Sequence, residues 1–319
     1  MLRILRVGAS DFETPSAAPA GWRLPADAVW IELVEPSREE ELAVEAELGV
    51  ALPTREEMAE IEPSSRLYQD AGATFMTAMV LYNADSEQPS AGPVTFVLAG
   101  ARLVTIRYFE PRSFKVFAAQ ALRQPSLCPD GARTFIGLID AVVDRTADVL
   151  ERVQGEVEEI SRDVFDADPS DFAKVLSRLG RAQGVIAKIR ESLVSLARLS
   201  SFAALAEQIV ASHDHREHLA SATQDVHSLL DHATYVSSNI VFLHDAALGL
   251  INLQQSNIIK IFSVAAVAFL PPTLVASIYG MNFEHMPELD WRAGYPMAIG
   301  LMIASAAGPL WWFKRKGWL

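Results

Sequence analysis

The residues best suited to chemistry lie in and beside a stretch near the C-terminus that carries no charged side chain. From Ile261 to Phe283 there is no Asp, Glu, Lys or Arg, and a helix needs about 20 such residues to cross a bilayer. Small polar side chains recur along this stretch at a spacing of seven, with one leucine among them. The members of this polar stripe are Ser256, Ser263, Leu270 and Ser277, with Thr273 one turn before the last.

The spacing keeps the polar stripe on one face of a helix, because an α-helix drifts by only about 20° per seven residues. Hydroxyl groups on one face of a membrane helix predict the lining of a pore, in which Leu270 would form an apolar constriction that can lose its water. Close packing between helices through small residues is the alternative interpretation.

The polar stripe ends at the run Tyr279-Gly280-Met281-Asn282-Phe283. A ring of neutral Asn282 amides at a pore mouth could accept hydrogen bonds from the water shell of a divalent cation. Carboxylates would instead bind and trap the ion, and Mg²⁺ in particular gives up its water reluctantly. Gly280 is expected to let the chain leave the helix in a tight turn. Capping of the helix is the alternative role for Asn282.

The elements that must position these residues are two membrane-spanning helices. A second charge-free stretch runs from Ala293 to Phe313, which is again long enough to cross a bilayer. Pro271 and Pro272 lack backbone donors and predict a kink in the first span, either static or acting as a hinge. A ridge of small residues on the second span predicts helix packing. Its members are Gly300, Ala304 and Gly308.

Basic residues predict the orientation of the spans. The second span ends in Lys314-Arg315-Lys316, and the loop between the spans carries the acids Glu284, Glu288 and Asp290. By the positive-inside rule both the C-terminal end and the segment before the first span are expected in the cytoplasm. Glu284 and Glu288 would then lie outside, where they either concentrate cations or only solvate the loop. A basic belt at the cytoplasmic mouth is expected from Lys260, Lys314, Arg315 and Lys316.

A long helical stalk precedes the first span. No proline occurs from His213 until Pro271, and one helix of about 65 residues would be about 100 Å long. Apolar residues at alternating spacings of three and four run for about five heptads, which predicts an oligomer. They are Leu219, Ala222, Val226, Leu229, Ala233, Val236, Ile240, Leu243, Ala247 and Leu250.

The N-terminal third has the pattern of a mixed α/β domain. Apolar runs predict strands at 30–34, 74–82, 94–99 and 103–108, and Ser37–Leu48 predicts a helix with a capping box. Helices are expected at Asp130–Phe165 and Ser170–Val210. We therefore expect an α+β membrane protein with four parts: a cytoplasmic α/β domain (1–125), a cytoplasmic helical hairpin (126–212), a stalk helix (213–257) and a two-helix transmembrane pore domain (258–319).

Charge and cysteine content exclude some functions. The residues up to Asn257 carry a net charge of −15 and the remainder +2, and this acidity disfavours nucleic acid as a partner. The single cysteine, Cys128, cannot form an intramolecular disulfide and fits a reducing compartment or a buried apolar position. His213, His215 and His218 suggest a zinc site, but their spacing fits a solvated helix face better.

Three segments together resemble the CorA family of magnesium transporters. They are the first span from Lys260-Ile261-Phe262-Ser263 to Gly280-Met281-Asn282-Phe283, the loop Met286-Pro287-Glu288-Leu289 and the ending Phe313-Lys314-Arg315-Lys316-Gly317-Trp318-Leu319. A bare Gly-Met-Asn tripeptide is a weak signal. Its position at the end of the first of two spans, before Met-Pro-Glu-Leu, is a specific one. Upstream, the resemblance extends weakly through Glu60-Ile61-Glu62 and Arg66.

The resemblance implies a homopentamer whose first span lines the pore, with Gly280, Met281 and Asn282 at the outer mouth. It implies passage of Mg²⁺, with Co²⁺ and Ni²⁺ as further substrates, through a pentameric funnel gated by cytoplasmic Mg²⁺. For the basic belt it implies a part in gating, while topology and lipid headgroup binding are the alternative roles. Charge and position, rather than the resemblance, nominate a regulatory Mg²⁺ site. Its residues are Asp85 and Glu87 on a hairpin turn and Asp225 on the stalk.

Two other classes of function compete with this interpretation. A zinc transporter of the same fold is the nearest rival, and the intact Met286-Pro287-Glu288-Leu289 loop favours the magnesium branch. A membrane-tethered scaffold would leave the polar stripe and the Gly-Met-Asn mouth without a purpose. We expect no enzyme and no organic cofactor. We also expect no nucleotide, either as a partner or as an energy source, since the sequence has no phosphate-binding loop motif.

Overall fold

The computed structural model describes residues 1–15, 22–60, 62–84, 86, 89–166, 172–281 and 286–317. The described chain forms two compact units. The first, the soluble unit, contains residues 1–166 and 173–244. The second, the membrane unit, begins at Asp245 and runs to the C-terminal end of the chain.

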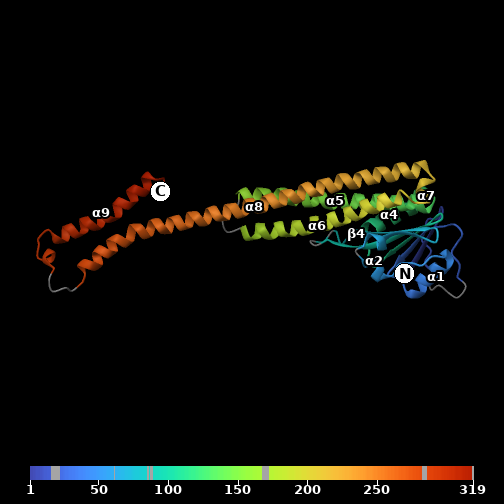
Figure 1. The fold of residues 1–319 in the computed structure, drawn as a ribbon, viewed down its shortest axis with the longest axis horizontal. Helices are drawn as coiled ribbons and strands as arrows, with labels where there is room; N and C mark the ends of the chain where they lie inside the picture. The colour runs from blue at the N-terminus through green and yellow to red at the C-terminus, as the bar shows by residue number, and fades with distance from the viewer. Residues whose placement is uncertain are drawn as a thin grey trace. The chain divides into compact units, whose positions relative to one another are not determined.

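A six-stranded sheet forms the centre of the soluble unit (Figure 1). The strands are β1 (Leu2–Arg6), β2 (Ala28–Val34), β3 (Leu67–Asp70), β4 (Ala73–Tyr82), β5 (Ser90–Ala99) and β6 (Arg102–Arg107), in the spatial order β1-β2-β6-β5-β4-β3. Only the pairing of β2 with β6 is parallel; the other pairs are antiparallel. The four predicted strands are confirmed, and β1 and β3 are two further strands at the edges of the sheet.

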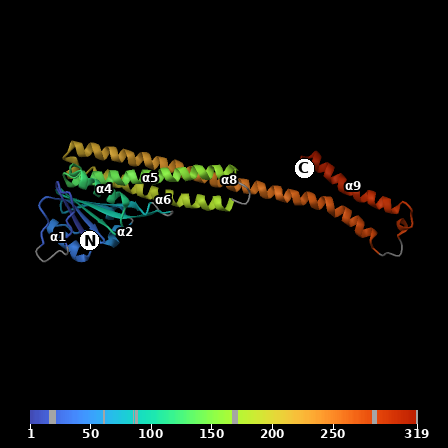
Figure 2. The ribbon, with the colours of Figure 1, turned by 180° about the vertical axis from the view of Figure 1, so that it is seen from behind.

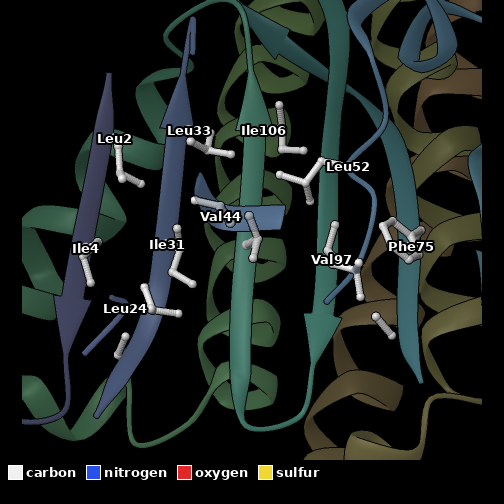
Figure 3. Close-up of a cluster of buried hydrophobic side chains, with 14 of the residues drawn as sticks. Leu2, Ile4, Leu24, Ile31, Leu33, Val44, Leu52, Phe75, Val97 and Ile106 are labelled. Atoms are coloured by element: carbon white, nitrogen blue, oxygen red, sulfur yellow. The ribbon is translucent and has the colours of Figure 1, made fainter. Parts of the chain in front are cut away.

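Each face of the sheet is covered by helices. One face packs against α1 (Arg38–Leu48) and α2 (Arg55–Ala59), which contribute Val44 and Met58 to an apolar cluster with the strands; Figure 3 shows part of this cluster. The predicted capping box of α1 is present, since the Ser37 hydroxyl accepts from the Glu40 N–H and the Glu40 carboxylate accepts from the Ser37 N–H. The short helices α3 (Pro63–Arg66) and η1 (Pro125–Leu127) lie in the connections.

The other face of the sheet carries an aromatic core with α4 (Arg112–Arg123) and α5 (Gly131–Asp166). Phe96 of β5 lies 6.1 Å from Phe114 of α4 and 5.6 Å from Phe135 of α5, measured between ring centroids. The helices predicted at Asp130–Phe165 and Ser170–Val210 are present, but the second is divided. It forms α6 (Phe172–Ala203) and α7 (Glu207–Val210), because Ala206 adopts an extended conformation before α7.

The apolar seam of the stalk packs inside the chain. Helix α8 (His213–Tyr279) runs alongside α5 and α6 in its first part (Figures 1 and 2), and His232 and Ser237 make hydrogen bonds to these helices. Eight of the ten seam residues are buried. The seam therefore has its partner within one chain and is not by itself evidence for an oligomer. The residues that α8 leaves exposed include Tyr235, Val241, Phe242 and Leu248.

The membrane unit contains two helices long and apolar enough to cross a membrane. Helix α8 continues through Pro271 and Pro272 to Tyr279, and after the short helix η3 (Pro287–Leu289) comes α9 (Gly294–Arg315). Of the most apolar 18-residue windows of α8 and α9, only 6% and 11% are buried. A core helix of a soluble protein would be mostly buried, so the predicted spans are the better interpretation.

Candidate ion-conduction site

The polar stripe lies on a face of α8 that is left exposed by the described part of the chain. All five of its residues are exposed, with Leu270 at 66%. The helix face that approaches α9 carries Val264, which is 8% exposed, and lines a cavity of about 550 Å³ together with Leu310 of α9. At 100° per residue, Leu270 points about 120° away from Val264 around the helix. The stripe is therefore available to other copies of the chain or to an aqueous path.

The hydroxyl groups of the stripe can offer acceptors to water. Thr273 Oγ1 donates its proton to the carbonyl oxygen of Phe269 at 2.7 Å, which is a common arrangement for threonine in a helix. The oxygen lone pairs remain free to accept hydrogen bonds from the water shell of a cation. A row of such acceptors suits a hydrated ion, because it replaces solvent without replacing the inner water shell.

Only part of the predicted pore mouth lies within the described residues. Gly280 and Met281 follow the end of α8, whereas Asn282 and Glu284 lie outside the described residues. Helix α8 ends at Tyr279 and Gly280 lies in a turn, without the positive φ of a left-handed glycine cap. Its N–H instead donates to the Ala276 carbonyl oxygen at 2.9 Å, and a Cβ at this position would lie 3.1 Å from the same oxygen. Glycine is thus explained here by a close approach rather than by a special conformation.

The outer loop is tied to the start of α9. Glu288 is exposed in η3, and its carbonyl oxygen approaches Gly294 so closely that a Cβ there would lie 2.1 Å away. The Gly294 N–H donates to the Trp291 carbonyl oxygen at 2.8 Å. The position of Glu288 therefore depends on a glycine at the first residue of α9.

The structure brings the two parts of the predicted basic belt to the same end of the helix pair. Lys260 of α8 lines the same cavity as Leu310 of α9, and Lys314 lies one turn beyond Leu310. Lys314, Arg315 and Lys316 are exposed, and the Arg315 guanidinium lies 5.6 Å from the centre of the Trp311 ring. This arrangement agrees with a positively charged end of the membrane unit.

The nominated regulatory site cannot be assembled from the described residues. Asp85 and Glu87 lie outside them, and Asp225 is exposed on α8. Asp225 lies close enough to Asp140 and Asp144 of α5 to raise the pKa of both carboxyl groups. Sequence reasoning missed these two aspartates, although their spacing of four places them on one face of a helix.

Within the described ranges, no three His, Cys, Asp or Glu side chains converge as metal ligands. The three histidines at the start of α8 each approach a different carboxylate: His213 approaches Glu217, His215 approaches Asp130 and His218 approaches Asp214. The interpretation of these residues as a helix face rather than a zinc site is the one that agrees with this geometry.

Comparison with known families places nearly the whole chain in one of them. Residues 25–315 match the family model described as CorA-like Mg²⁺ transporter protein. The magnesium transport proteins CorA of Salmonella typhimurium and Escherichia coli are each 36% identical to the chain over 294 residues. These residues are 92% of this chain and 92% of each relative.

Comparison with solved structures gives the same fold. The complete CorA magnesium transporter of Methanocaldococcus jannaschii superposes with a TM-score of 0.79 at 15% identity, over 100% of this chain and 99% of that one. The full-length CmaX protein gives 0.68 at 14% identity, over 98% and 96%. The cytoplasmic domain of ZntB from Vibrio parahaemolyticus gives 0.54 at 12% identity, over 80% and 98%. CmaX and the ZntB domain therefore share only their fold with this chain.

Proposed function

The chain belongs to the CorA-like Mg²⁺ transporter family, and from this premise we propose that it conducts Mg²⁺ passively into the cell through a pore in the cytoplasmic membrane. The soluble unit and both ends of the chain lie in the cytoplasm, in keeping with the basic residues after the second span. No nucleotide is needed as an energy source, because moving two charges inward yields about 4.6 kcal/mol per 100 mV.

The observation that carries this proposal is the exposed polar stripe on the α8 face that points away from α9. One copy of this face cannot enclose a path, so several chains must surround it with their α8 helices. A homopentamer is the arrangement that the family resemblance implies. Leu270 then forms an apolar ring within the path, which conducts when the ring is wide enough to stay wet.

Selection takes place at the outer mouth, where Gly280, Met281 and Asn282 follow the polar stripe. Asn282 amide oxygens accept hydrogen bonds from the water shell of the ion, so that size and hydration decide which ions enter. Glu284 and Glu288 raise the local cation concentration by their charge. Co²⁺ and Ni²⁺, which also carry firmly held water shells, are further substrates.

Internal Mg²⁺ regulates the pore through acidic groups between neighbouring soluble units. Asp85 and Glu87 of one subunit and Asp225 of the next bind the ion, which screens their mutual repulsion. Support comes from the surroundings of Asp225, where the carboxylates of Asp140 and Asp144 add further negative charge. When internal Mg²⁺ falls, the repulsion separates the subunits and the pore widens. The basic belt takes part in this gating.

The decisive experiment compares Mg²⁺ flux through the wild-type protein and the Asn282→Ala variant, reconstituted in liposomes with a Mg²⁺-sensitive dye inside. Cobalt hexammine, which mimics the hydrated ion, is added outside. We expect the mimic to block the wild-type flux. The variant should lose at least about 90% of the flux, which corresponds to a rise of about 1.4 kcal/mol or more in the activation free energy of conduction. Asn239→Ala, a half-buried position in the soluble part of α8, is the matched control and should conduct normally.

The same assay distinguishes the rival functions. Zn²⁺ flux without Mg²⁺ flux would assign the chain to zinc transport, and the absence of flux for every divalent cation would favour a scaffold. Normal Mg²⁺ flux through Asn282→Ala would show that Asn282 is not the selectivity filter, and the proposal of Mg²⁺ transport would still stand.

A further inference from the structure

A cavity of about 470 Å³ in the soluble unit gathers three arginines, and its lining includes no residue of the proposed conduction path. Arg66 enters it from the end of α3, while Arg190 and Arg198 enter it from α6. Its volume falls in the range typical of small-molecule sites, about 300–1,000 Å³. We call this cavity the arginine cleft.

The walls of the arginine cleft are held in place by two serines of α6. Ser195 Oγ accepts from the Met79 N–H at 2.9 Å, and Ser192 Oγ donates to the Met79 carbonyl oxygen at 2.8 Å. Met79 lies on β4 beyond the last residue that pairs with β3, so these hydroxyl groups satisfy an otherwise open strand edge. The cleft therefore joins a fixed strand edge to a fixed helix face.

The positive charge of the cleft has no counter-charge within the described part of the chain. The side chains of Arg190 and Arg198 form no hydrogen bond or ion pair with any described residue, and the Arg66 side chain donates only to the backbone carbonyl of Glu60. Glu191, the one acid in the lining, is already paired with Lys188 at 2.9 Å. Solvent screens the repulsion among these charges because Arg190 and Arg198 are exposed, so the attraction of the cleft for an anion depends on direct hydrogen bonds to the guanidinium groups.

The surrounding helix differs from the rest of the soluble unit in its charge. Residues up to Asn257 carry a net charge of −15, yet α6 has six basic residues and one acidic residue. The cleft combines its guanidinium groups with uncharged side chains, which are the apolar Leu67, Met79, Ala187 and Val194 and the hydroxyl residues Thr77 and Ser195. A ligand that fits must therefore combine a strong anionic group with an uncharged body.

We propose that the arginine cleft binds an organic phosphate of nucleotide size, contrary to the expectation from the sequence that no nucleotide is a partner. Arginine forms paired hydrogen bonds with phosphate oxygens, which lysine cannot reproduce. Arg190 and Arg198 hold the phosphate groups, Arg66 adds a third donor, and the apolar residues contact the organic body. The proposal goes beyond ion conduction and does not depend on it.

The test uses the full chain in detergent, free of divalent cations by chelation, with fluorescently labelled ATP as the probe and fluorescence anisotropy as the readout. We expect saturable binding that unlabelled ATP displaces, that tripolyphosphate displaces about tenfold more weakly, and that adenosine does not displace. Added salt should weaken the binding, because phosphate contacts are electrostatic.

Paired variants locate the binding. Arg190→Gln/Arg198→Gln should lower the affinity at least about tenfold, and Arg190→Lys/Arg198→Lys should lower it by a smaller factor. The matched control is Arg162→Gln/Arg216→Gln, which removes two exposed arginines outside the cleft and should leave the affinity unchanged. Unchanged melting temperatures without ligand would show that all variants are folded.

Several results would overturn the assignment. Equal affinity in the two glutamine pairs would place the binding elsewhere, and the absence of saturable binding at about 1 mM would remove the site. If tripolyphosphate displaced the labelled ATP as strongly as unlabelled ATP does, the organic part of the ligand would contribute nothing to binding. Loss of ATP binding in nanodiscs with anionic lipid, but not with zwitterionic lipid, would assign the cleft to a lipid headgroup instead. Mg²⁺ flux of the same variants reconstituted in liposomes tells failure of this proposal apart from failure of conduction.

Discussion

Asp140 on α5 is a carboxyl group in an unfavourable position for its charge. Burial and the carboxylates of Asp144 and Asp225, opposed by Arg133 and His218, together raise its pKa to about 6. A carboxyl group whose folded pKa lies above the unfolded value of 3.8 contributes its full stability only below the unfolded pKa. This contribution is lost as the pH rises through the folded pKa.

Asp140→Asn should therefore stabilise the protein at neutral and alkaline pH. The full shift would correspond to about 3 kcal/mol, but solvent screening of this partly exposed group reduces the expected gain to about 1 kcal/mol. The gain at pH 5 should be about half that at pH 8, since ionisation of the folded form is then incomplete. Thermal unfolding in detergent with chelator at the two pH values measures it.

The control for Asp140→Asn is Asp231→Asn, which removes an exposed carboxylate of α8 that has no partner in the described part of the chain. Its effect should stay within about 0.5 kcal/mol at both pH values. If Asp140→Asn destabilised the protein at pH 8, the carboxylate would have to make a favourable contact, and the assignment of its raised pKa would be wrong.

At the scale of elements, Gly294 links α9 to the outer loop through its close approach to the Glu288 carbonyl oxygen. In Gly294→Ala the new methyl group would lie 2.1 Å from that oxygen, so the loop must move. Because the loop carries Glu288 beside the proposed mouth, we expect Mg²⁺ flux to fall by about tenfold and block by cobalt hexammine to weaken. The liposome assay measures both.

Gly155→Ala provides the control. Gly155 is exposed on α5, and a Cβ there meets no atom within 4 Å among the described residues, so this variant should conduct as the wild type does. Wild-type flux and block in Gly294→Ala would show that the loop can adapt without consequence for the mouth.

Elements with a strong repeating pattern could be predicted from the sequence. The capping box of α1, the four central strands and both spans have local signals that the structure retains. Strands β1 and β3 were missed because they are short edge strands with charged or polar residues, such as Arg3 in β1 and Asp70 in β3. Helix α4 was missed although Phe114, Phe117 and Ala121 repeat at helical spacing, a signal that could have been used.

The seam of α8 shows what a periodic pattern leaves open. Heptad spacing predicted which face of the helix is buried, but it cannot distinguish a partner helix of the same chain from one of another copy. For the candidate site, the spacing of the polar stripe predicted one shared face. That this face points away from α9 depends on contacts between segments distant in the sequence, which no local pattern contains.

At the scale of the whole molecule, the exposed apolar residues of α8 form two groups on different sides of its open face. Tyr235 and Phe242 are seven residues apart, as are Val241 and Leu248, and the two groups lie about 120° apart around the helix. Two different apolar surfaces suit a ring, in which each copy presents one surface to one neighbour and the second to the other. We therefore expect this face of α8 to pack between subunits.

Tyr235→Glu/Phe242→Glu should break such an assembly. The two side chains are 63% and 60% exposed in a single chain, so the change costs the isolated subunit little. In a ring, however, every interface would have to bury unpaired carboxylates, at about 2 kcal/mol or more for each. Light scattering coupled to size-exclusion chromatography in detergent should show a smaller species at neutral pH, and Mg²⁺ flux should fall with it.

Gln120→Glu/Gln124→Glu adds the same charge at exposed positions of α4 and its C-terminal cap and should leave the assembly intact. An unchanged mass for the α8 variant would mean that subunits meet through another surface, and the stalk would then have no part in holding the pore together.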